Sequence, residues 1–306
     1  EIKLVWSSIF DIAKKDPIHL PFFFPLLKQY SIAVFEFQNY QSEEIQASVQ
    51  KASDSSLTLD ERFENLKPLI YLISILPLQT NLIIFKLIID IVFLQLSENQ
   101  KEKTLSILEN TVCSSINDEI LESYIDIVES FIDTEKVAAS LFVLAYFSKF
   151  IIEILPETCS KICSWIIKNL TSPQPQNKIA ALFLLKHASQ SFSFNPKAVP
   201  MNDIFSLILP LLVDKDPSIQ KVANKATKYL ISSQICYTKE AITALLSQYS
   251  SYSHDQLPSF FSLLHRFLDN NESPQLLIIQ KIFDFTITSL TASKDDFVLS
   301  SCVELL

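Results

Sequence analysis

The hydrophobic and polar positions from Leu211 to Ile231 follow the period of an α-helix, with one sharp turn between two runs. On a helical wheel at about 100° per residue, the apolar side chains of the second run share one arc of about 120°, and its lysines lie opposite. The apolar residues are Ile219, Val222, Ala223, Ala226, Tyr229 and Leu230, and the lysines are Lys221, Lys225 and Lys228. The pattern predicts an amphipathic helix with Asp216 as its N-cap and Pro217 at its first position.

Proline and a polar cap also precede other helical runs. Pro173 and Pro175 stand before one apolar-periodic run, and Ser273 with Pro274 stands before another. Second helices of successive pairs are therefore expected near residues 137, 176, 216, 255 and 294, and first helices near residues 118, 156, 201, 238 and 274. A step of about 40 residues containing two helices is typical of an α-solenoid, because one pair is too small to bury its apolar face alone.

Upstream of residue 118 the helices have a less regular register. They are expected at residues 1–16, 21–38, 60–76, 80–97 and 100–116. Residues 41–60 are polar and serine-rich, so we interpret them as a loop or insertion, as a weak surface helix, or as a place where residues are missing from the sequence.

The uncharged stretch from Pro68 to Phe85 reaches the lower limit of length for a membrane-spanning helix. Four residues that disfavour a span stand in its middle: Pro77, Gln79, Thr80 and Asn81. We therefore interpret the stretch as a turn between two buried helices, and we expect no membrane span.

The segment around residue 216 resembles the HEAT-repeat, armadillo-like family. The family pattern of an apolar first helix, a proline-containing turn and a second helix is matched by Leu212, Asp214, Asp216, Pro217, Ile219 and Ala223. Gln220 stands in place of the family arginine, and Thr227 in place of a leucine. The resemblance implies an all-α, right-handed solenoid of HEAT-like helix pairs. We expect it to run as one continuous unit over residues 1–306, as a fragment of a longer chain.

Composition excludes several kinds of chemistry. The chain contains no glycine, so it has neither a phosphate-binding glycine loop nor a glycine-flanked nucleophile elbow. Its net charge of −9 argues against general nucleic-acid binding. Five cysteines, odd in number and without a spacing pattern, fit reduced thiols and an intracellular location, cytoplasmic or nuclear.

Charge is unevenly distributed along the chain. Residues 104–135 contain no lysine or arginine, and five of their acids recur at alternating steps of three and four: Glu119, Glu122, Asp126, Glu129 and Asp133. Residues 161–228 are rich in lysine instead, and the candidate contact residues there are Lys178, Lys186, Lys221, Lys225 and Lys228. The HEAT resemblance implies that the Lys221 helix faces the concave side and the acidic helix the convex side. Such faces are either simply solvated, paired with one another, or docking surfaces of opposite sign.

Candidate catalytic and metal-binding residues are few. Cys159 and Cys163 lie one helical turn apart without a second pair of ligands, so we interpret them as core residues. The four histidines are scattered, and no nucleophile–base set stands out. Of the three successive residues Phe22, Phe23 and Phe24, we expect two to be buried and one to fill the groove to the next repeat, with an exposed aromatic anchor as the alternative.

We therefore predict a non-catalytic protein-interaction scaffold, or a subunit of a larger assembly. It would use no cofactor, metal or small-molecule substrate and would bind other proteins through the charged surfaces. Two alternatives remain open. The first is a transport receptor resembling the karyopherins, and the second is the helical arm of a much larger enzyme whose catalysis lies elsewhere.

Overall fold

A computed structural model of the chain describes residues 2–15, 43–73, 76, 78–94, 118–233, 239–269 and 276–305. The chain divides into two compact units, Glu1–Phe147 and Ser148–Leu306. Within the described residues, all regular structure is helical. The expected helices at 21–38 and 100–116 lie outside these residues, as do Phe22, Phe23 and Phe24. The expectation of one continuous solenoid stays a prediction.

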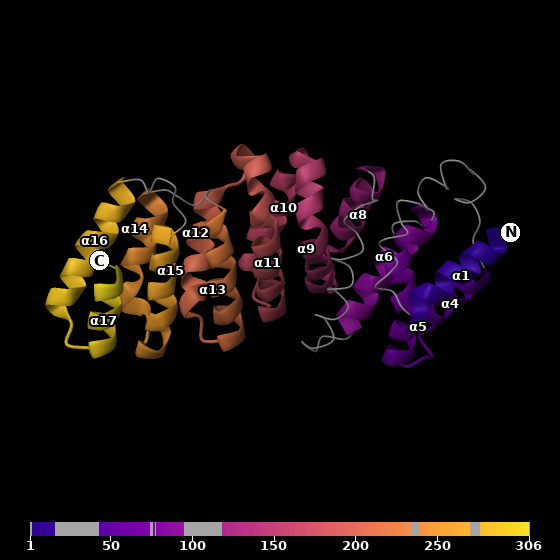
Figure 1. Cartoon of the computed structure of the whole chain (residues 1–306), viewed down its shortest axis with the longest axis horizontal. Coiled ribbons are helices and arrows are strands. Elements are labelled where there is room, and N and C mark those ends of the chain that lie inside the picture. Colours follow the sequence, from indigo (N-terminus) through magenta and orange to yellow (C-terminus); the bar gives the residue numbers. More distant parts are fainter. Residues whose placement is uncertain are drawn as a thin grey trace. The chain divides into compact units, whose positions relative to one another are not determined.

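The second unit consists of two layers of helices (Figure 1). One layer contains α10 (Cys159–Leu170), α12 (Met201–Ile208), α14 (Lys239–Ser247) and α16 (Leu276–Ala292). The other contains α11 (Pro175–Ala188), α13 (Pro217–Ser232), α15 (Leu257–Asp269) and α17 (Asp296–Leu305). Each helix packs on the next one in its own layer, which is the arrangement expected of stacked helix pairs. The predicted step of about 40 residues is therefore confirmed here.

Short 3-10 helices extend or join these α-helices. They are η3 (Pro156–Thr158), η4 (Ser189–Phe194), η5 (Pro196–Ala198), η6 (Leu209–Val213), η7 (Tyr249–Ser251) and η8 (His254–Gln256). The tighter turns let the chain leave one helix and enter the next within a few residues.

The first unit contains α1 (Ile2–Lys15), α4 (Glu43–Ser53), α5 (Leu59–Leu72), α6 (Leu78–Leu94), α8 (Asp118–Phe131) and the start of α9 (Val137–Ile154). Helix α4 occupies the polar segment whose structure the sequence left open. It packs against α5 and buries Ile45, Ser48 and Ala52. Three buried residues about one turn apart give this polar helix enough of a face to join the stack.

The stretch from Pro68 to Phe85 divides into two helices, because α5 ends at Leu72 and α6 begins at Leu78. The interruption is confirmed, but its position differs from the expectation: Gln79, Thr80 and Asn81 lie inside α6 rather than in the turn. Helix α9 alone among the described helices is long and apolar enough to cross a membrane, and 78% of that segment is buried inside the protein. Such burial is typical of a core helix.

Side-chain oxygens replace glycine at the helix ends. At α13, the Asp216 carboxylate accepts a hydrogen bond from the backbone N–H of Ser218 at 2.8 Å, as predicted for an N-cap. At three C-termini a hydroxyl donates to the carbonyl three residues earlier: Thr171 to Lys168, Ser189 to Lys186 and Ser233 to Leu230. These C-caps keep right-handed backbone angles, so no residue there needs positive φ.

Candidate protein-binding surfaces

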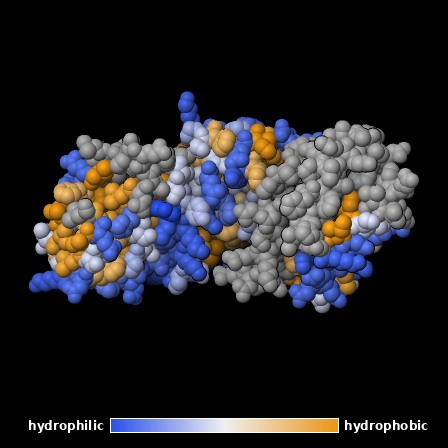
Figure 2. Space-filling model, viewed as in Figure 1, coloured by the Kyte–Doolittle hydropathy of each residue, from blue (hydrophilic) through white to orange (hydrophobic). Residues whose placement is uncertain are grey.

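Five partly or fully exposed lysines lie on the neighbouring helices α11 and α13, and we call them the lysine surface. They are Lys178 and Lys186 on α11, and Lys221, Lys225 and Lys228 on α13. Lys221 and Lys225 are exposed, and the other three are partly exposed. Figure 2 shows hydrophilic side chains gathered over α13 on the face drawn. The structure therefore brings the lysines predicted from separate repeats onto two helices that pack side by side.

Most of this positive charge has no internal counter-ion. Lys178, Lys221, Lys225 and Lys228 form no ion pair within the described parts of the chain. Three of them follow one another along a single face of α13 at spacings of four and three, where like charges repel. An anionic partner would relieve that repulsion.

Lys186 lies between two aromatic rings from different helices. Its Nζ is 5.6 Å from the ring centroid of Phe183 on α11 and 5.1 Å from that of Tyr229 on α13. A cation over a ring at these distances is attracted by the negative π face. The contact therefore holds the lysine and the tyrosine together at the boundary of the two helices.

Tyr229 differs from the expectation for it. The helical wheel assigned it to the apolar, inward arc, but the side chain is 40% exposed. It sits at the edge of that arc, where helix α11 rather than the core is its neighbour. The signal in the sequence was its position at the edge of the apolar arc, next to Lys225 on the helical wheel.

Helix α8 carries the predicted acidic residues, which we call the acidic ridge. Glu119, Glu122, Asp126 and Glu129 lie on the helix and Asp133 in the turn that follows it, and all five are exposed. Residues on the opposite side, among them Leu121, Tyr124 and Val128, are buried. The predicted separation of an acidic from an apolar face is confirmed.

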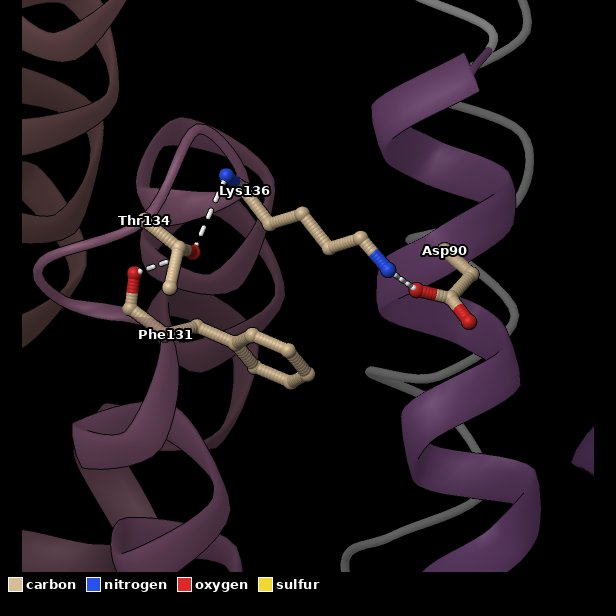
Figure 3. Close-up of polar contacts among 4 residues, drawn as sticks. All are labelled: Asp90, Phe131, Thr134 and Lys136. Carbon is tan, nitrogen blue, oxygen red and sulfur yellow. Dashed lines mark hydrogen bonds and ion pairs between the residues drawn. The ribbon is translucent and has the colours of Figure 1, made fainter.

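Lys136, the first lysine after the acidic ridge, extends its side chain toward α6 (Figure 3). Lys136 Nζ forms an ion pair with Asp90 of α6, while its backbone N–H donates to Thr134 Oγ1 at 3.2 Å. Thr134 Oγ1 in turn donates to the carbonyl of Phe131 at 2.9 Å. The turn therefore positions Lys136 against α6, where Asp90 balances the positive charge of the lysine.

The described residues also contain buried thiols and a partly buried imidazole. Cys159 and Cys163 are buried in α10, and their mutual hydrogen bond together with burial raises the pKa of Cys163. No group of three or more His, Cys, Asp or Glu side chains in the described part of the chain is arranged to hold a metal ion. Burial, with the nearby charge of Lys186, lowers the pKa of His187 to about 4, so this imidazole is neutral at pH 7.

Comparison with known proteins identifies the fold. No protein-family model matches the chain, and neither does any curated protein sequence. Among solved structures, Kap121p bound to RanGTP matches with a TM-score of 0.59 over 99% of this chain, at 12% sequence identity. The fold is a HEAT/armadillo-like α-solenoid. The solenoid spans 31% of the length of Kap121p.

A designed armadillo repeat protein in complex with the peptide (KR)4 also matches, with a TM-score of 0.46, 13% identity, and coverage of 86% of this chain and 98% of that one. At such identities these similarities concern the fold alone. The match to Kap121p confirms the all-α solenoid that the forty-residue period predicted. The contact residues of this solenoid have to be argued from its own side chains.

Proposed function

We propose that this chain is a non-catalytic, protein-binding solenoid whose lysine surface docks an acidic region of a partner protein. The observation that carries the proposal is the exposed ring of Tyr229 beside four lysines that form no ion pair within the described residues: Lys178, Lys221, Lys225 and Lys228. Tyrosine is enriched where proteins meet, and a patch of one charge steers a partner of opposite charge and fixes its register. In this proposal the solenoid is a scaffold or a subunit of a larger, intracellular assembly.

Charge reversal tests this proposal directly. The variant Lys221→Glu/Lys225→Glu/Lys228→Glu should lose salt-sensitive partners that co-purify with the wild-type chain. It should also lose binding to a synthetic glutamate-rich peptide measured by fluorescence anisotropy. Surface charges act through screened attraction, so raising the salt concentration should weaken wild-type binding in the same way.

A matched control separates the surface from the overall charge. Lys149, Lys197 and Lys294 are exposed lysines outside the lysine surface, and their reversal to glutamate changes the net charge equally. The control variant should keep its partners. If the test variant keeps the same partners with the same salt dependence, the lysine surface is only solvated and the proposal fails.

A second docking surface is favoured by the acidic ridge. Four of its carboxylates are exposed on one side of α8 and the fifth is exposed in the turn that follows. Lys136, the nearest following cation, is paired with Asp90. We propose that this ridge receives a basic segment, in a contact independent of the lysine surface. A labelled Lys/Arg peptide should bind the wild-type chain and should bind the lysine-surface variant equally well.

The transport-receptor alternative has its own test. Kap121p, one of the matching structures, is bound to RanGTP, but the likeness to this chain shows only a shared fold. A receptor of that kind would bind a small GTPase in its GTP-loaded form and release it in the GDP-loaded form. Equal recovery of both forms in a pull-down would support the scaffold proposal instead.

A further inference from the structure

The lysine surface has an apolar centre as well as a charged margin. Building on the proposed function, we infer that its acidic partner segment carries an aromatic or aliphatic anchor side chain, which packs against Tyr229 between α11 and α13. The partner is thus an acidic and apolar peptide segment rather than a purely acidic one. The inference follows from the apolar side chains that accompany the lysines.

Partly exposed apolar side chains occur on both helices at this boundary. On α11, Ile179 and Phe183 are partly exposed and lie one turn apart on the same face. On α13, Val222 is partly exposed and shares a face with Tyr229, two turns later. The contacts of Lys186 with Phe183 and Tyr229 show that these two faces meet. The boundary therefore presents an interrupted apolar strip.

Lysines stand along one margin of this strip. Lys225 precedes Tyr229 by one helical turn and Lys221 by two turns, and all three side chains are exposed. Exposed ion pairs contribute little affinity individually, but they orient the incoming chain and select its sign. The burial of an anchor against a tyrosine supplies the larger share of affinity in such interfaces.

The Tyr229 ring is already held in place before a ligand binds, which favours an anchor at this position. Tyr229 is held by the ammonium of Lys186, so less side-chain freedom is lost when a ligand packs on it. An aromatic platform with lysines could also stack a nucleic-acid base. The net charge of −9 opposes a polyphosphate ligand, so we favour the peptide and make the nucleic acid an outcome of the test.

The test compares two synthetic peptides that carry equal charge. One is Glu-Glu-Asp-Phe-Glu-Glu-Leu-Glu-Glu, and the other has serine in place of phenylalanine and leucine. We expect the anchored peptide to bind the wild-type chain about tenfold more tightly in fluorescence anisotropy. The Tyr229→Ala variant should lose this advantage and still bind the serine peptide as the wild type does.

Two controls keep the result specific. Tyr229→Phe retains the ring and should retain the tenfold advantage. Phe194→Ala removes another exposed aromatic side chain, 55% exposed on η4, and should also retain it. Circular dichroism of each variant checks that the helices are intact. A lower helix content in Tyr229→Ala than in Tyr229→Phe would reveal a folding defect.

The outcomes separate the inference from the proposed function. If both peptides bind equally and the lysine reversal abolishes both, the acidic partner stands and the anchor is wrong. If neither peptide binds the wild type, both proposals fail. If a single-stranded oligonucleotide displaces the anchored peptide at a lower concentration than the unlabelled peptide does, the surface is a nucleic-acid site and the inference is overturned.

Discussion

The hydroxyl of Tyr124 on α8 donates a 2.5 Å hydrogen bond to the side-chain Oδ1 of Asn81 on α6. The Nδ2 of Asn81 donates in turn to the backbone carbonyl of Ile73, at the end of α5, at 2.7 Å. Both side chains are fully buried, and the Tyr124 ring stacks on Phe85 with centroids 3.8 Å apart. Burial raises the pKa of Tyr124, so it stays a neutral donor. One amide thus connects three helices within the first unit.

Removal of the Tyr124 hydroxyl should destabilise the first unit. The Tyr124→Phe variant keeps the stacked ring but leaves the Oδ1 of Asn81 buried without a donor, which costs about 1–3 kcal/mol. Urea denaturation followed by circular dichroism would measure the loss. Tyr71→Phe is the control, because Tyr71 is partly exposed and makes no hydrogen bond through its hydroxyl within the described residues. Equal stability of the two variants would contradict the prediction.

Acidification should weaken the second unit through His187. In the unfolded chain this histidine binds a proton below about pH 6.5, whereas the folded state resists protonation until about pH 4. The unfolded state therefore binds more protons in this window, and stability falls as the pH drops through it, by up to about 3 kcal/mol. Above the window the contribution is constant.

The His187→Gln variant should remove this part of the pH dependence. We expect the difference in unfolding free energy between wild type and variant to change between about pH 7.5 and pH 4.5. If His187→Gln loses as much stability on acidification as the wild type, another group is responsible.

Partial neutralisation of the acidic ridge should stabilise α8. Glu122→Gln with Asp126→Asn removes repulsion between neighbouring carboxylates, worth about 0.2–0.5 kcal/mol per pair, so a gain of about 1 kcal/mol is expected. The control Glu157→Gln with Asp203→Asn makes the same charge change elsewhere and should give a smaller gain. The ridge variant, Glu122→Gln with Asp126→Asn, should also bind a Lys/Arg peptide more weakly than the wild type does. Higher thermal stability together with unchanged peptide binding would show that the ridge is only solvated.

Loss of the Asp216 cap should cost about 1 kcal/mol of stability. Asp216→Ala removes the acceptor for the Ser218 backbone N–H at the start of α13. Lys215→Ala alters the adjacent exposed residue in the same turn without touching that hydrogen bond. Thermal unfolding of the two variants would check the difference, and a similar effect from both changes would mean that the cap contributes nothing measurable.

The period and the helix starts of the second unit could be predicted because two local signals agree there. Apolar periodicity marks each buried face, and a proline marks the start of α11 at Pro175 and of α13 at Pro217, where Asp216 is the cap. In the first unit these signals conflict at Asn81, an amide inside an apolar helix. A wheel cannot show that Tyr124, forty-three residues later, supplies the partner that makes such burial tolerable.

The candidate surface could be predicted in its charge but not in its apolar centre. Counting charges along the sequence found Lys221 and Lys225, because an excess of lysine can be seen without knowing which residues are neighbours in the fold. The helical wheel placed Tyr229 in the core, because a wheel gives the direction of a side chain around the helix but not the residue that it contacts. Only the packing of α11 against α13 shows that Lys186, rather than the interior, meets this ring.

The hydroxyl-bonded C-caps at Thr171, Ser189 and Ser233 have a consequence for sequence divergence. Their right-handed backbone accepts any residue with a side chain, so these turns impose no requirement for a particular amino acid beyond one replaceable hydroxyl. A solenoid whose helices end in such C-caps can therefore change its sequence at these turns and still stack its helices.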